Sequence, residues 1–151
     1  MNRRQQIQLT PEEQAAFLQE PNKAALATID KSGFPHVVAM GFLAKDGLIY
    51  MTSYAKAQKV LNIRRNPKVA VMVESGKTYG DYRGIMIRGT CEIIEDPVVV
   101  EQTMRELTRS NQGGSSGAPK TAINSAPKRA LLKITPVKTA SWDHTKLGGK
   151  Y

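Results

Sequence analysis

The chain has 151 residues, of which 40% are hydrophobic and 23% charged, a composition typical of one folded domain rather than a disordered chain. No apolar stretch approaches the roughly 20 residues that cross a bilayer, and the basic N-terminus lacks the apolar segment of a secretory signal. The net charge of +9 favours anionic ligands without choosing among them. Cys91 is the only cysteine, so we predict a cytoplasmic protein with Cys91 as a buried thiol.

The first 53 residues predict one helix followed by three strands. Thr10 and Glu13 flank Pro11 in a helix-starting capping box, and Pro21 ends this helix. Three apolar stretches bounded by turn residues then predict strands at Ala24–Ile29, Pro35–Leu43 and Leu48–Ser53. The connections at Asp30–Gly33 and Asp46–Gly47 are too short for parallel crossovers, so we expect an antiparallel meander.

The second half predicts more strands with helices between them. A cationic amphipathic helix is expected within Ser53–Pro67, and a second helix after Asp96-Pro97. Strands are expected at Lys68–Glu74, Tyr82–Glu95 and Arg129–Trp142, with a Gly/Ser-rich flexible loop at 111–127. The whole chain, 1–151, therefore predicts a single mainly β domain, a small closed or split β-barrel with helices at its ends.

The cationic helix carries the clearest candidate site. On a helical wheel Ala57, Val60, Leu61 and Ile63 form the buried side, whereas Gln58, Asn62 and Arg65 lie opposite. Lys59 lies at the edge of the buried side, and Arg64 lies within it, where a guanidinium must find a partner or extend to water.

Thr52 and Ser53 end a strand where this helix begins. Their hydroxyls, the free backbone N–H groups and the positive end of the helix dipole are expected to converge there. With Lys59 and Arg64 added, the segment predicts a phosphate pocket. The alternative is an amphipathic helix whose cations form only a solvated rim.

An ordered series of segments resembles a known family. It runs through TPEEQAAFLQEP, ALATIDKSGFPHVVAMGFLAKDGLIYMTS, KAQKVLNIRRNPKVAVMV, RGIMIRGTCEI and SWDHTKLGG. The series resembles the pyridoxamine 5′-phosphate oxidase-like FMN-binding split barrels, within them the flavin/deazaflavin-dependent oxidoreductases. The resemblance implies a homodimer with two cofactor sites at the subunit interface.

The resemblance also implies which residues bind the cofactor. The strand holding Val38, Ala39 and Met40 is expected along the flavin ring. Thr52 and Ser53 are expected to contact the ring and phosphate arm, and Lys59, helped by Arg64, to bind the phosphate. Weaker candidates from the second subunit are Lys77, Tyr79 and Trp142.

Two departures from true pyridoxamine phosphate oxidases direct the functional hypothesis. The strand VVAMGFL lacks their arginine and lysine, and the tail SWDHTKLGGKY lacks their Arg-rich substrate motif. The resemblance therefore favours the B-type branch, in which the deazaflavin coenzyme F420 passes a hydride to an activated double bond of a small molecule. The alternatives are FMN in its place, a haem-binding protein of this fold, or a carrier that binds a cofactor without turnover.

Other chemistries have weaker support in the sequence. The two histidines, His36 and His144, have no cluster of metal-ligand residues beside them, so no metal site is predicted. His36 is a candidate cofactor contact, and the sequence indicates no catalytic residue. A nucleic-acid-binding module is the rival from another class, but aromatic residues make up only 6% of the chain and no long Lys/Arg run occurs.

Overall fold

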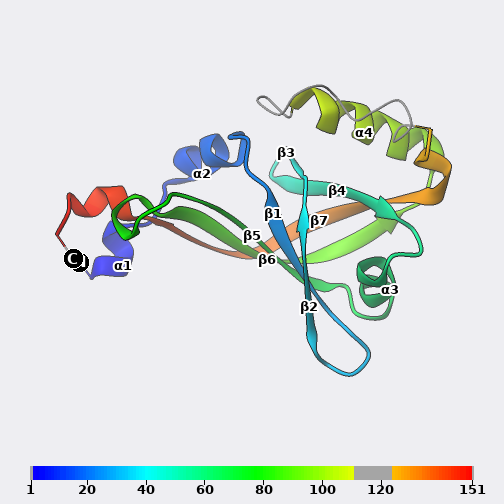
Figure 1. Ribbon diagram of the computed structural model, residues 1–151, viewed down its shortest axis with the longest axis horizontal. Coiled ribbons are helices and arrows are strands. Elements are labelled where there is room, and N and C mark those ends of the chain that lie inside the picture. Colours follow the sequence, from blue (N-terminus) through cyan, green and yellow to red (C-terminus); the bar gives the residue numbers. More distant parts are fainter. Residues whose placement is uncertain (1, 111–123, 151) are drawn as a thin grey trace.

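The computed structural model describes residues 2–110 and 124–150, in which one seven-stranded antiparallel sheet curls on itself (Figure 1). The mainly β split-barrel prediction is confirmed. Most of the predicted 111–127 loop lies outside the described residues. The strands are β1 (Ala24–Ile29), β2 (Pro35–Met40), β3 (Leu43–Lys45), β4 (Leu48–Tyr54), β5 (Lys68–Ser75), β6 (Arg83–Ile94) and β7 (Arg129–Asp143).

Helices lie between the strands and at the ends of the chain. The α-helices are α1 (Arg3–Gln6), α2 (Pro11–Leu18), α3 (Gln58–Arg65) and α4 (Pro97–Ser110). The 3₁₀ turns are η1 (Tyr79–Asp81), η2 (Ala126–Lys128) and η3 (His144–Leu147). None of the helices in the described ranges is long and apolar enough to span a bilayer.

The strand order explains why the sheet curls. It runs β2-β1-β5-β6-β7-β4-β3, so β2 and β3 lie at opposite edges. Only Gly41 and Phe42 separate these two strands in the chain. Three Cα steps span at most about 11 Å, so the two edges must approach each other. A two-residue connection thus holds the sheet in barrel form.

Two predictions are wrong here. Pro35–Leu43 is not one continuous strand, and the first three predicted strands do not form a meander. The apolar stretch breaks at Gly41–Phe42, because the residues before the break pair with β1 and those after it pair with β4. Since β4 pairs with β7 on its other side, β2 and β4 are not neighbours. Hydrophobicity continues across the break, so the local pattern does not reveal it.

Several local predictions are confirmed. The α2 capping box forms, with the Thr10 hydroxyl accepting from the Glu13 N–H and the Glu13 carboxylate accepting from the Thr10 N–H. Asp46 and Gly47 take positive φ angles of 54° and 76° in the β3–β4 hairpin. In β6 the predicted inner face is buried, including Ile85 and Ile87, and the other face is more exposed.

The core fills the barrel, and a smaller cluster lies outside it. Inside, Leu26, Met51, Val71, Ile85 and Leu132 are among the fully buried side chains. Outside, α4 covers β4 and β7 by packing Val100 and Met104 against Leu131 and Tyr50. The helix α3 packs against β1 and β6. Its first turn follows the end of β4 closely in the chain.

Candidate functional site

Helix α3 packs with a different face from the one that the wheel predicts. Its buried residues are Val60, Asn62 and Ile63, whereas Leu61 is 45% exposed, so the predicted positions of Leu61 and Asn62 are wrong. Asn62 is completely buried because it is hydrogen-bonded: its Nδ2 donates to Thr28 Oγ1 at 3.0 Å, and its Oδ1 accepts from Gln58 Nε2 at 2.8 Å. A helical wheel based on hydropathy cannot indicate such a hydrogen-bond network.

The rotated helix brings Lys59 onto the packed face. Residues three and four positions apart share a helix face, so Lys59 lies beside the buried Asn62 and Ile63. Lys59 is half-buried, and its ammonium has no hydrogen bond or ion pair to any residue that the structure describes. A half-buried cation left in this state is suited to bind an anion from outside the chain.

The first turn of α3 adds backbone donors to this cation. Ala57 is the N-cap and supplies no side-chain cap. The N–H groups of Gln58 and Lys59 donate to no acceptor within 2–110 or 124–150. The helix has eight residues, and its positive end favours an anion at these donors. Together, the Lys59 ammonium and the two N–H groups are the candidate anion site of this chain.

The end of β4 contributes less than the sequence predicts. Side chains alternate along a strand, so Thr52 and Ser53 point to opposite faces and their hydroxyls do not converge. Ser53 is buried, and its Oγ donates to the Tyr54 carbonyl at 3.3 Å. Thr52 is half-buried on the other face. Their contact with a cofactor stays a prediction.

Two cations at this end were missed by sequence reasoning. Arg129 pairs with Tyr54 across β4 and β7, and its guanidinium carbon lies 4.2 Å from the centre of the Tyr54 ring. The carbonyl of Lys128 accepts from the Ala55 N–H at 3.0 Å. The Arg129 guanidinium and the Lys128 backbone therefore lie close to the β4–α3 connection. Their sequence distance from it leaves no local signal, because only the β4–β7 pairing joins the two segments.

Arg64 lies apart from Lys59. Five helical positions place the two side chains about 140° apart around the helix and about 7.5 Å apart along it. Arg64 is exposed, so its predicted position within the buried side of the helix is wrong, and its guanidinium binds the Glu95 carboxylate at 2.6 Å on the surface. Its role at the phosphate stays a prediction. Arg65, expected only to face water, also donates to the Ile29 carbonyl at 3.0 Å.

The strand predicted along the flavin ring presents one of its three candidate side chains outward. Val38 and Met40 pack against the barrel core, whereas Ala39 is exposed on the outer face of β2. His36, on the inner side of the same strand, has a buried Nδ1 without a hydrogen-bond partner in the described part of the chain.

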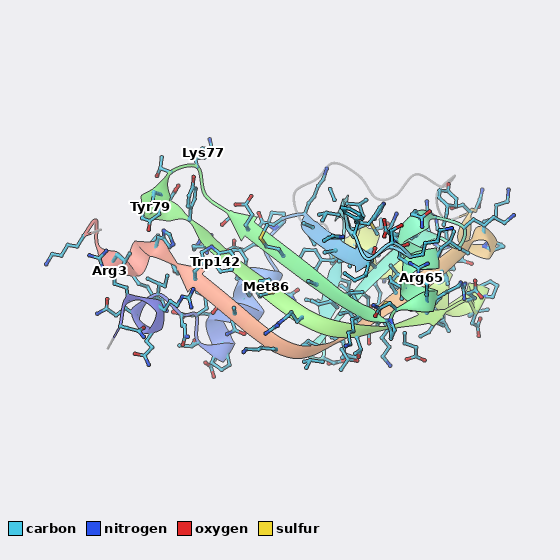
Figure 2. All side chains as sticks on the ribbon, turned by 90° about the horizontal axis from the view of Figure 1, so that it is seen from below. Arg3, Arg65, Lys77, Tyr79, Met86 and Trp142 are labelled. Atoms are coloured by element: carbon cyan, nitrogen blue, oxygen red, sulfur yellow. The ribbon has the colours of Figure 1, made fainter. Side chains whose placement is uncertain are left out.

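The three remaining candidates lie together at the far end of the sheet. Figure 2 shows Lys77, Tyr79 and Trp142 at one end, Arg65 at the other, and Met86 between them. Strand β5 begins just after α3 and ends just before Lys77, and its seven residue steps correspond to about 23 Å. A single copy therefore does not bring these residues to Lys59.

Local packing orients the side chains at this far end. The Tyr79 ring contacts His144 edge to face at 4.6 Å, and His144 Nδ1 lies 2.7 Å from the Tyr79 carbonyl oxygen. The Trp142 indole lies against Gly84, where an added Cβ would come within 2.2 Å of its Cζ2. The Tyr79 and His144 rings therefore pack on each other, and the Trp142 indole packs on Gly84.

The described residues offer anion binding but little acid–base or nucleophilic chemistry. Burial, and secondarily the charge of Glu92, raises the pKa of the Cys91 thiol to about 12, so this thiol is neutral and unreactive near pH 7, and its prediction as a buried thiol is confirmed. Within the described ranges, no group of three or more His, Cys, Asp or Glu residues could hold a metal ion. Redox chemistry at this site would need a bound cofactor.

Comparison with known families and structures is consistent with this geometry. A family model described as pyridoxamine 5′-phosphate oxidase matches residues 10–143. A conserved hypothetical protein from Mycobacterium tuberculosis is 33% identical with a TM-score of 0.86, over 100% of this chain and 95% of that one. A comparison with curated proteins finds no match.

Two further structures show different uses of this fold. An F420 reductase is 27% identical with a TM-score of 0.70, over 87% of this chain and 98% of that one. The haem storage protein HutZ from Vibrio cholerae is 19% identical with a TM-score of 0.67, over 91% of this chain and 95% of that one, and shares the fold alone.

Proposed function

Because this chain belongs to the pyridoxamine 5′-phosphate oxidase family, and membership fits a flavin-binding oxidoreductase, we propose that it binds the deazaflavin coenzyme F420 and reduces a small organic substrate. The cofactor would supply a hydride to an activated double bond. FMN in the same site is the alternative cofactor. The expected cytoplasmic location and the pairing of two copies belong to the same proposal.

The observation that carries the proposal is the unpaired Lys59 at the start of α3. Its ammonium and the two free N–H groups would hold the cofactor phosphate, with Lys128 and Arg129 adding positive charge nearby. The fit is chemical: the Lys59 ammonium and two free N–H groups at a positive helix end would donate to the anionic oxygens of a phosphate group. The protein would bind and orient the cofactor, and the cofactor ring would supply the redox chemistry.

Two features favour the deazaflavin over FMN. The F420 reductase is 27% identical to this chain over nearly all of its own length. The net charge of +9 also suits a cofactor that carries an oligoglutamate tail as well as a phosphate. A haem-binding function has less support, because the haem storage protein shares only the fold.

Cofactor titration of matched variants tests the phosphate site. We expect Lys59→Ala to lose a charge-assisted contact of about 1.5–3 kcal/mol, which corresponds to roughly 10- to 100-fold weaker binding of F420 or FMN. Lys56→Ala removes an exposed cation three residues away and serves as the control. Equal affinities for Lys59→Ala and the unmodified protein would exclude this site.

A turnover assay separates an enzyme from a carrier. Reduced F420 absorbs and emits differently from the oxidised cofactor, so its oxidation can be followed after an α,β-unsaturated ketone is added. An enzyme oxidises the bound cofactor faster than the free cofactor reacts. A protein that binds F420 tightly without accelerating oxidation by any activated alkene tested would be a carrier.

A further inference from the structure

The outer face of the sheet carries a hollow that combines apolar and basic side chains. Its volume is about 650 Å³, within the range of roughly 300–1,000 Å³ that small-molecule pockets occupy. Small or aliphatic residues line one part of it: Ala27, Ile29, Ala70 and Val137. The charged residues that line it are Lys68, Arg88 and Lys138, and no acidic residue of the described ranges joins them.

Strand pairing arranges these side chains in one row. Five residues lie side by side across β2, β1, β5, β6 and β7: Val37, Ala27, Ala70, Arg88 and Lys138. The residues before and after this row along β5 and β6 are buried, so the row faces outward. The β2–β1–β5 part of the row is therefore apolar, and the β6–β7 part is cationic.

A β-bulge shapes the hollow at its basic end. Arg88 pairs with Lys138, whereas the next residue of β6 pairs with Pro136. Val137 is therefore an extra residue without a partner on β6, and it is 73% exposed. An added Cβ at Gly89 would come within 2.6 Å of a carbonyl oxygen of β7, so glycine is what permits this close approach.

The cations around the hollow have no compensating charge close by. All three are exposed, and none of their side chains has a hydrogen bond or ion pair to the described residues. Arg88 and Lys138 lie directly opposite each other, an arrangement of like charges that destabilises a sheet. Glu74 and Glu92, on β5 and β6, are each four residues from the row, about 13 Å along the strand. A bound anion would relieve the repulsion between the two cations.

We propose that this hollow binds an amphipathic organic acid, a flat apolar molecule that carries a carboxylate. The carboxylate lies between Arg88 and Lys138, because a guanidinium can donate to both oxygens and the ammonium adds a second positive charge. The apolar body lies over Ala27 and Ala70, whose short side chains leave room for a planar ligand. Val137 packs against the edge of that body.

The hollow is separate from the candidate phosphate site. Lys59 lies in the first turn of α3, whereas Asn66, the C-cap residue of the same helix, lines the hollow. Seven helical positions separate them by about 10 Å along the helix axis. Arg65, next to Asn66, marks this end of the sheet in Figure 2. The inference goes beyond the proposed function, since binding of the acid requires no cofactor.

Fluorescence titration of the cofactor-free protein with 1-pyrenebutyrate, a flat apolar acid, tests the hollow. We expect it to bind at least about tenfold more tightly than the matched neutral probe 1-pyrenebutanol. Arg88→Gln and Lys138→Gln should each weaken binding of the acid by about tenfold and leave binding of the alcohol unchanged. Ala70→Trp fills the hollow and should weaken binding of both probes.

Arg3→Gln is the matched control, because it removes an exposed arginine at the opposite end of the sheet and should not change binding (Figure 2). Since Arg88 and Lys138 repel each other, neither glutamine variant should lower the unfolding temperature, which separates lost binding from lost folding. Equal affinities for the acid and the alcohol, or normal binding of the acid by both glutamine variants, would overturn the proposal.

Lys59→Ala distinguishes the hollow from the phosphate site. This variant should bind 1-pyrenebutyrate as the unmodified protein does. Loss of that binding would place the acid at the phosphate site and would overturn a separate hollow. Failure of the unmodified protein to bind F420 and FMN, with 1-pyrenebutyrate still bound, would support the hollow and overturn only the proposed function.

Discussion

Replacing Asn62 by leucine perturbs the polar network buried beneath α3 that joins Asn62 to Thr28 and Gln58. Asn62 and Thr28 are almost fully buried, and the 3.0 Å bond between them is the Thr28 hydroxyl's only side-chain hydrogen bond within the described residues. Leucine has the same branching as asparagine and a larger volume, so the change removes hydrogen bonding without opening a cavity. The Gln58 amide also loses an acceptor, but it is exposed and can turn to water.

The structure sets the expected free-energy changes of unfolding. Asn62→Leu leaves the Thr28 hydroxyl buried without a partner, which should lower stability by about 1–3 kcal/mol. Thr28→Val leaves the Asn62 amide buried without that partner, at a similar cost. The double variant places two apolar side chains together and avoids both penalties. We therefore expect it to be less destabilised than the sum of the single variants by about 1–3 kcal/mol.

Urea unfolding followed by circular dichroism measures this coupling. Leu61→Ala, at an exposed position next to Asn62, is the control and should change stability by less than about 1 kcal/mol. Because Asn62 also fixes the first turn of α3, Asn62→Leu should weaken cofactor binding even where the protein is fully folded. Additive effects of Thr28→Val and Asn62→Leu would refute the reasoning.

Three further predictions concern packing and ionisation. Gly84→Ala places a Cβ about where the indole of Trp142 lies, so the emission of this single tryptophan should change; an unchanged spectrum would contradict the packing. Arg83 binds both carboxylate oxygens of Glu20 at 3.0 Å, so Arg83→Ala should lower stability by roughly 1–2 kcal/mol, and Arg83→Lys should recover only part of it. The pKa of Cys91 is about 12 when folded against an ordinary value of 9.0, so its contribution to stability is complete below pH 9.0 and lost as pH rises toward 12. Alkylation with iodoacetamide near pH 8 should therefore need urea, and rapid labelling of the folded protein would disprove the burial.

Local chemistry explains which elements the sequence predicts correctly. The Thr10–Glu13 capping box and the Asp46-Gly47 turn each depend on residues within four positions of one another, so every residue that takes part is close in the sequence. The two faces of β6 follow from strand alternation in the same way. The prediction of Lys59 near a helix start has the same local origin.

Tertiary structure alone decides which faces and ends of these elements meet. Asn62 is buried because Thr28, 34 residues earlier, satisfies its amide, and this rotation places Lys59 on the packed face of α3. The break at Gly41–Phe42 likewise depends on partners at two distant sheet edges. The strand pairings also set Lys59 and Trp142 at opposite ends. Hydrogen bonding between segments far apart in the chain is a property of the folded whole, and hydropathy along the sequence does not encode it.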